Sequence, residues 1–288
     1  MIRKLIFTIL IGIISFNTFS QQKAAYVIFD SKGKKVSYQK MEKEILKKKF
    51  VFFGELHNDA IAHWLQYELL ISLYKKHGTD LIAGSEMFER NQQKYLDLYL
   101  SGKINEQELE DSTKMWSNFK TDYLPMLIYA KDNSIPWIAT NTVRKYASLV
   151  YKKGKESLDS VPEIEKTLFA PSNFPVDVTL SQYDNLLKEF THAGPNFVCA
   201  QAIKDATMGE SIVKALKSNT VFYHLNGAYH TDFHQGILWY VKYYGQFDYS
   251  EMITISVVNQ ANLKKLEPSY YGKADFIICT PESMTKTH

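Results

Sequence analysis

Apolar runs of strand length alternate along the chain with segments of helical periodicity. The runs that predict strands are 25–30, 36–38, 50–53, 81–88, 136–141, 220–225, 253–258 and 276–279. The segments that predict helices are 40–49, 60–76, 92–100, 106–111, 122–131, 143–153, 201–217 and 235–244. Within one of them, Ile61, Leu65 and Leu69 recur at the spacing of a single helix face. This alternation predicts an α/β fold with a central, mostly parallel sheet flanked by helices.

The segment from about 156 to 195 breaks this rhythm. It contains four of the eight prolines and has little strand character. We therefore predict a mainly helical insertion within one α/β domain that spans residues 21–288.

Residues 1–20 have the pattern of a secretory signal peptide. Arg3 and Lys4 precede the apolar run 5–14, and small or polar residues lead to Ser20, where we expect cleavage. The apolar run is shorter than the roughly 20 residues that cross a bilayer. With no cysteine near the expected cleavage point, the pattern predicts a periplasmic or secreted protein without a lipid anchor.

Net charge and the positions of the cysteines narrow the range of possible functions and partners further. The formal net charge is +3, and Arg3 and Lys4 of the predicted signal contribute two of these charges. Because no basic run is present, nucleic acid is not an expected partner. Cys199 and Cys279 both lie in apolar surroundings, which predicts two buried free thiols and no disulfide.

Carboxylates and imidazoles follow three of the predicted strands. Glu55 and His57 follow the run 50–53, Glu86 ends the next strand, and His230 follows the strand 220–225. The carboxyl ends of parallel strands share one edge of the sheet, so we expect these four side chains to share a pocket. They are suited to binding a divalent metal or to acid–base catalysis. The alternative is a hydrogen-bonded network that ties the loops together.

Several common motifs are absent from the sequence. It has no Gly-x-Ser-x-Gly elbow, no glycine-rich phosphate-binding loop and no Cys-x-x-Cys. These absences argue against a nucleophile-elbow hydrolase, a nucleotide-binding protein and covalently attached haem.

An ordered set of short motifs resembles the ChaN-like haem-binding uptake proteins, which share a loose superfamily with Tiki, TraB and erythromycin-esterase-like proteins. The motifs are 54–59, 63–66, 86–88, 116–123, 139–141, 201–208, 226–230 and 271–276. They extend over nearly the whole chain after the predicted signal. Each motif alone is weak, and their order makes the resemblance specific.

The resemblance implies an exported, iron-regulated protein that binds haem for haem or iron acquisition. It also implies a homodimer and an outer-membrane haem or iron receptor as partner. By position, Glu55, His57, Glu86, Arg144 and His230 correspond to the polar cluster of the superfamily, which is catalytic in some branches. The chain departs from many relatives in lacking an anchor cysteine.

Two functions use the same predicted pocket. For haem binding, the expected axial ligand is His57, His230 or Tyr123. For a hydrolase of the Tiki or erythromycin-esterase-like type, Glu55, His57, Glu86 and His230 would bind a divalent metal, or His57 would act as a general base oriented by Glu86. A third interpretation is a cofactor-free scaffold that docks to a receptor.

The aromatic stretch 116–129 is a candidate surface for the haem ring. It contains Trp116, Phe119, Tyr123 and Tyr129. Ordinary packing of a helix in the core is the alternative.

Overall fold

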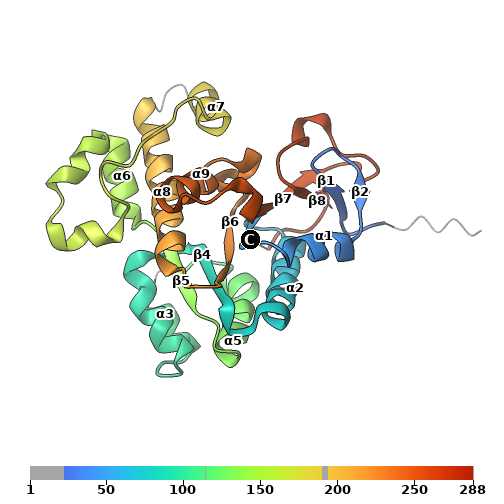
Figure 1. The fold of residues 1–288 in the computed structure, drawn as a ribbon, viewed down its shortest axis with the longest axis horizontal. Coiled ribbons are helices and arrows are strands. Elements are labelled where there is room, and N and C mark those ends of the chain that lie inside the picture. Colours follow the sequence, from blue (N-terminus) through green and yellow to red (C-terminus); the bar gives the residue numbers. More distant parts are fainter. Residues whose placement is uncertain (1–22, 114, 190–193, 288) are drawn as a thin grey trace, which may run out of the picture.

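The computed structural model describes residues 23–113, 115–189 and 194–287 (Figure 1). The predicted signal peptide, residues 1–20, lies outside the described residues. Cys199 and Cys279 are both free, as predicted, but Cys279 alone is buried and Cys199 is partly exposed.

The described residues form one eight-stranded sheet in the order β2-β1-β8-β7-β3-β6-β4-β5. The strands are β1 (Val27–Asp30), β2 (Lys35–Val36), β3 (Phe50–Glu55), β4 (Leu81–Glu89), β5 (Trp137–Asn141), β6 (Val221–Gly227), β7 (Met252–Gln260) and β8 (Phe276–Pro281). Strands β3 to β8 pair in parallel, and the hairpin β1–β2 adds antiparallel strands at the β8 edge. The predicted α/β fold with a mostly parallel sheet is confirmed.

Helices cover both faces of this sheet (Figure 1). They are α1 (Tyr38–Ile45), α2 (Ala60–His77), α3 (Gln93–Leu100), α4 (Glu106–Ser112), α5 (Leu124–Asp132), α6 (Arg144–Lys153), α7 (Ser181–Glu189), α8 (Pro195–Ala215) and α9 (Ile237–Gly245). Helix α8 begins six residues before the predicted start at 201, with Pro195 in its first turn, where a missing N–H costs no hydrogen bond. No helix in the described ranges is both long and apolar enough to span a bilayer.

Strand β3 shows how the two core layers arise. Val51 and Phe53 pack into the core shared with α2 and α5, whereas Phe50 and Phe52 pack into the core shared with α8 and α9. This follows from the two-residue period of a strand, because successive side chains point to opposite faces. The consequence is a strand buried on both sides, which explains its continuous apolar run.

The chain leaves neighbouring strands β3 and β6 toward opposite faces of the sheet. Strand β3 continues into α2, whose buried side chains belong to the first core, and β6 leads to α9, whose buried side chains include Leu238 and Val241 of the second core. Because β3 and β6 are adjacent and parallel, their exits separate and open a crevice at their carboxyl ends.

The predicted insertion contains 3₁₀ turns at Lys155–Ser160 and Glu163–Leu168 followed by α7. Its apolar side chains form a third core with α6 and α8, in which Phe169 and Tyr183 are buried. The described part of the insertion therefore consists of short helical segments that pack against α6 and α8.

Asp59 connects α2 to the far part of the sheet. Its Oδ1 atom accepts hydrogen bonds from the backbone amides of Ile61 (3.1 Å) and Ala62 (3.0 Å), as expected for an N-cap. Its Oδ2 atom accepts from the Thr280 hydroxyl (2.6 Å) and the Asn259 amide (3.2 Å). One buried carboxylate thus accepts hydrogen bonds from α2, β7 and β8.

We predict that Asp59→Ala lowers the free energy of unfolding by about 2–4 kcal/mol, because it removes a helix cap and leaves buried donors unpaired. The matched control is Asn105→Ala, which removes the cap of the exposed helix α4 and is expected to cost about 1 kcal/mol. Urea denaturation measures both. Equal losses for the two variants would contradict the role assigned to Asp59.

Candidate functional site

A cavity of about 890 Å³ opens at the carboxyl ends of the parallel strands. Its walls include Glu55 and His57 from the exit of β3, Glu86 from β4 and His230 from the turn after β6. The structure therefore brings together the four strand-end residues that the sequence places at one sheet edge. Lys204 of α8 completes one side of the cavity.

Glu55 is a buried carboxylate held by three side-chain donors. Its Oε1 atom accepts from His57 Nδ1 (2.8 Å) and from the Tyr123 hydroxyl (2.5 Å). Its Oε2 atom accepts from the Gln66 amide (2.5 Å). A buried carboxylate without such donors is costly, so these bonds fix Glu55 in one orientation.

His57 joins this buried carboxylate to the cavity. Its side chain is 38 % exposed, and its ring packs edge-on against Trp116 with centroids 4.6 Å apart. Burial disfavours the charged ring, but the hydrogen bond to Glu55 and the nearby charge of Glu86 outweigh it and raise the pKa of His57. Because Nδ1 donates to Glu55, the neutral ring carries its lone pair on Nε2, which has no hydrogen bond to any described residue.

Gly227 is required for this arrangement. A Cβ atom on Gly227 would lie 2.9 Å from both Nε2 and Cε1 of His57. The backbone of β6 can therefore approach the imidazole only because residue 227 has no side chain.

Glu86 and His230 form a second, largely buried pair. His230 Nε2 lies 3.1 Å from Glu86 Oε1, and the Gly227 amide donates to Glu86 Oε2 (2.8 Å). The other ring nitrogen, Nδ1, donates to Asp205 of α8, whose second oxygen accepts from the Tyr183 hydroxyl (2.7 Å). The result is a chain of hydrogen bonds from the insertion helix α7 to the cavity.

The pKa values of this pair move in opposite directions. Burial opposes the charged form of His230, but the negative charges of Glu86 and Asp205 dominate and raise its pKa to about 10. Burial likewise opposes the charge on Glu86, but His230 and His57 lower its pKa well below the usual range. His230 is thus a buried imidazolium at neutral pH, flanked by two carboxylates.

Two supporting residues, Asp205 and Gln66, were not among the predicted site residues. Asp205 carries a signal in the sequence, because it lies among apolar positions of a helix, where an unpaired acid is costly. Gln66 lies in the motif 63–66 of the family resemblance, but that motif does not predict its partner Glu55, which is set by tertiary packing.

The aromatic stretch 116–129 packs mainly in the core, so its prediction as a haem-facing surface is wrong. Phe119 and Met126 are buried in the core that contains α2, and Tyr129 packs against other tyrosines. Tyr123 is 3 % exposed, does not line the cavity and donates to Glu55 from beneath it. Trp116 reaches the site through its contact with His57.

Arg144 does not join the polar cluster, in contrast to the position that the resemblance implied. It is the first residue of α6, is exposed, and lines a neighbouring hollow of about 200 Å³. The physical reason is that the chain after β5, at the sheet edge, turns into α6, which places the Arg144 side chain in the adjoining hollow and not in the site cavity.

The predicted metal site is not formed. In the part of the chain that the structure describes, no group of three or more His, Cys, Asp or Glu side chains is arranged to hold a metal ion. Glu55 already accepts from three donors, and both ring nitrogens of His230 lie against carboxylates. Among the four predicted ligands, His57 Nε2 is the atom left without a hydrogen bond to described residues.

A cavity at the switch point of a helix-covered parallel sheet defines the class as a ligand-binding α/β protein. Within that class, the chain belongs to the family described as "Haem-binding uptake, Tiki superfamily, ChaN", whose model matches residues 41–241. A search of curated proteins found no match.

Solved structures share this fold at low sequence identity. The structure "Cofacial heme binding to ChaN of Campylobacter jejuni" is similar with a TM-score of 0.65 and 18 % identity, covering 90 % of this chain and 98 % of that one. A Bacillus cereus protein is similar with a TM-score of 0.50 and 12 % identity, covering 84 % and 90 %. An erythromycin esterase reaches 0.48 and 10 % identity over 89 % and 83 %, which is too distant to carry an argument about activity.

Hydrolysis stays a prediction from the sequence, and the structure changes the roles assigned within it. Glu55 orients the His57 ring through Nδ1, whereas Glu86 acts on that ring through its charge and pairs with His230. The predicted orientation of His57 by Glu86 is therefore wrong.

The buried pair predicts a stability maximum between pH 4.5 and 6.5. Because the pKa of His230 is raised, its contribution is full below its ordinary value of 6.5 and is lost as the pH rises toward about 10. Because the pKa of Glu86 is lowered, its contribution is present above the ordinary value of 4.5 and is lost as the pH falls below it. We predict that Glu86→Gln flattens both limbs, measured by urea denaturation from below pH 4.5 up to about pH 10.

The control for this measurement is Glu44→Gln, which removes an exposed carboxylate paired with Lys47. It should leave the alkaline limb unchanged. If Glu86→Gln and wild type lose stability in parallel above pH 6.5, the buried pair is not the source of that limb.

Proposed function

We propose that the chain binds haem in the cavity at the carboxyl ends of β3 and β6, where His57 Nε2 would bind the iron. The observation that carries this proposal is the Glu55–His57 pair at the cavity wall. An imidazole that binds a metal characteristically donates its other ring nitrogen to a carboxylate, which fixes the tautomer and raises the basicity of the ligand nitrogen. Haem iron is commonly held by one such histidine.

The size and lining of the cavity support the same ligand. Its volume of about 890 Å³ lies within the range of roughly 300–1,000 Å³ typical of cofactor sites. Leu56, Ala228, Val257 and Val258 contribute apolar wall, and Tyr229 contributes an aromatic ring. A flat hydrophobic macrocycle needs such a surface beside its axial ligand.

The family and its structural relative agree with this ligand. The family is described as haem-binding, and the Campylobacter jejuni structure is described as cofacial heme binding to that protein. Both descriptions concern other members, and the residues of this chain that would hold haem are inferred from its own cavity.

We propose further that the protein is exported and acts in iron-regulated haem or iron acquisition. The pattern of residues 1–20 supports export to the periplasm or beyond, and the family's description as an uptake protein supports the process. A homodimer and an outer-membrane haem or iron receptor as partner belong to the same proposal and rest on the family resemblance.

We predict that titration of the purified protein with haemin produces a shifted Soret band, and that His57→Ala weakens haemin binding at least about tenfold because the axial ligand is lost. The matched control is His77→Ala, which removes a histidine near the end of α2 that does not line the cavity. Unchanged spectra for wild type on haemin addition would refute haem binding. Equal affinities for wild type and His57→Ala would refute the ligand.

We predict that haemin affinity rises with pH through the raised pKa of His57 and levels off above it, since a proton on Nε2 competes with iron. Glu55→Gln removes the charge that supports the protonated ring, so the rise should move to lower pH. The same variant should bind about 10–100-fold more weakly at high pH, because the ligand loses its carboxylate partner. A pH profile that is identical in the two proteins would contradict this coupling.

A further inference from the structure

A second hollow, of about 200 Å³, adjoins the site cavity between α6 and α8. Gln201 and Lys204 of α8 line both spaces, so the two meet at that helix. Phe197 of α8 also lines the hollow, and the wall opposite α8 is formed by Arg144 and Tyr151 of α6. Figure 1 shows α6 beside α8, on the side of the sheet where the insertion packs.

The two cations of this hollow have no side-chain partners among the described residues. Within that part of the chain, neither the Lys204 ammonium nor the Arg144 guanidinium makes an ion pair or a hydrogen bond, and only the backbone amide of Arg144 does, donating to Glu89 (3.1 Å). By contrast, Lys273 on the opposite wall of the site cavity pairs with Asp232 (2.7 Å). Two cations without a side-chain partner in the described part of the chain, beside the site cavity, favour an anionic group on its ligand.

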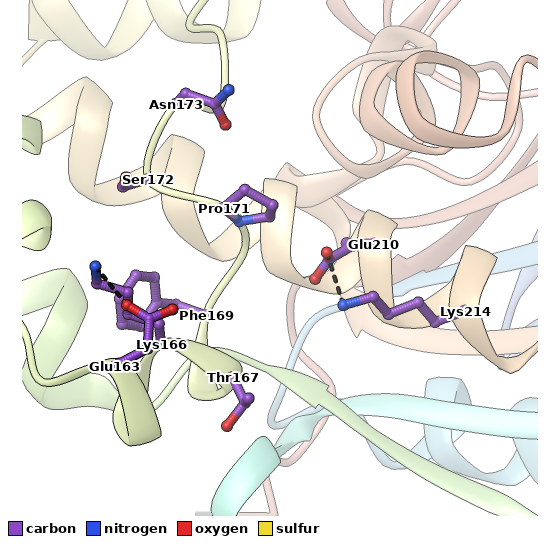
Figure 2. Close-up of a pocket in the computed structure, with 9 residues that line it drawn as sticks. All are labelled: Glu163, Lys166, Thr167, Phe169, Pro171, Ser172, Asn173, Glu210 and Lys214. Carbon is purple, nitrogen blue, oxygen red and sulfur yellow. Dashed lines mark ion pairs between the residues drawn. The ribbon is translucent and has the colours of Figure 1, made fainter.

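Another hollow of the molecule shows the opposite arrangement. It has a volume of about 400 Å³ and lies between the insertion and α8 (Figure 2). Its two lysines are neutralised within it, Lys166 by Glu163 (2.9 Å) and Lys214 by Glu210 (2.8 Å), and both pairs are marked in Figure 2. It therefore offers no excess positive charge to an anion.

We propose that Lys204 and Arg144 bind the propionate carboxylates of the haem whose ring occupies the site cavity. This inference rests on the proposed function and adds the residues that recognise the acidic edge of the ligand. Arg144 can meet a carboxylate with two parallel N–H donors, and Lys204 acts as a point charge. Tyr151 and Phe197 supply the apolar surface next to these charges.

The test compares haemin with haemin dimethyl ester, which has the same ring and iron but no propionate charge. The measured quantity is the ratio of the two affinities, obtained from Soret titrations. Wild type should prefer haemin, and Lys204→Gln and Arg144→Gln should each lower the preference about tenfold, as expected for loss of one charge-assisted bond. Lys204→Arg should retain the preference, because it keeps the charge.

The matched control is Lys145→Gln, which removes the neighbouring cation of α6 that already pairs with Glu165 (2.5 Å) and should leave the ratio unchanged. If wild type binds haemin and the dimethyl ester equally, or if both glutamine variants keep the wild-type ratio, the propionate site is refuted while haem binding stands. If wild type binds neither compound, the proposed function fails and this inference fails with it.

Discussion

Burial of two carboxylates, Glu55 and Glu86, is the constraint on which the rest of the site depends. Glu55 ends β3 and Glu86 lies three residues before the end of β4, and the side chain of each is almost wholly removed from water. Burying an uncompensated charge in that position would cost more free energy than the whole net stability of a typical domain. Each carboxylate must therefore be surrounded by hydrogen-bond donors. The two carboxylates solve this differently: Glu55 uses neutral donors and His57, whereas Glu86 uses the imidazolium of His230 and a backbone amide.

These two solutions give the two histidines different chemical roles. His230 has both ring nitrogens against carboxylates and a raised pKa, so it serves as a fixed buried cation. His57 uses one nitrogen for Glu55 and keeps part of its ring exposed at the cavity. The two histidines look equivalent in the sequence, because each lies within four positions of a strand end. In the structure, His230 is a buried structural cation, whereas His57 is the candidate ligand. The difference arises from their neighbours.

The sequence was sufficient to predict the sheet, its helices and the four strand-end residues, because these depend on local periodicity and on the geometry of parallel strands. The sequence was not sufficient to predict the hydrogen-bond partners of these residues. The hydrogen-bond partners of Gln66, Asp205 and Tyr183 are distant in the sequence, and tertiary packing alone brings them together. Tyr123 was predicted at the cavity and lies beneath it, since aromatic periodicity does not distinguish a core face from a ligand face.

The insertion is part of the site's support, although it lies outside the strands that form the crevice. Tyr183 of α7 donates to Asp205, and Asp205 holds the ring of His230 from the side opposite Glu86. Without Asp205, the Nδ1 atom of His230 would lose its carboxylate acceptor in a buried position. The insertion helix therefore fixes the orientation of His230. The charge of His230 keeps Glu86 ionised, and the negative charge of Glu86 raises the pKa of His57.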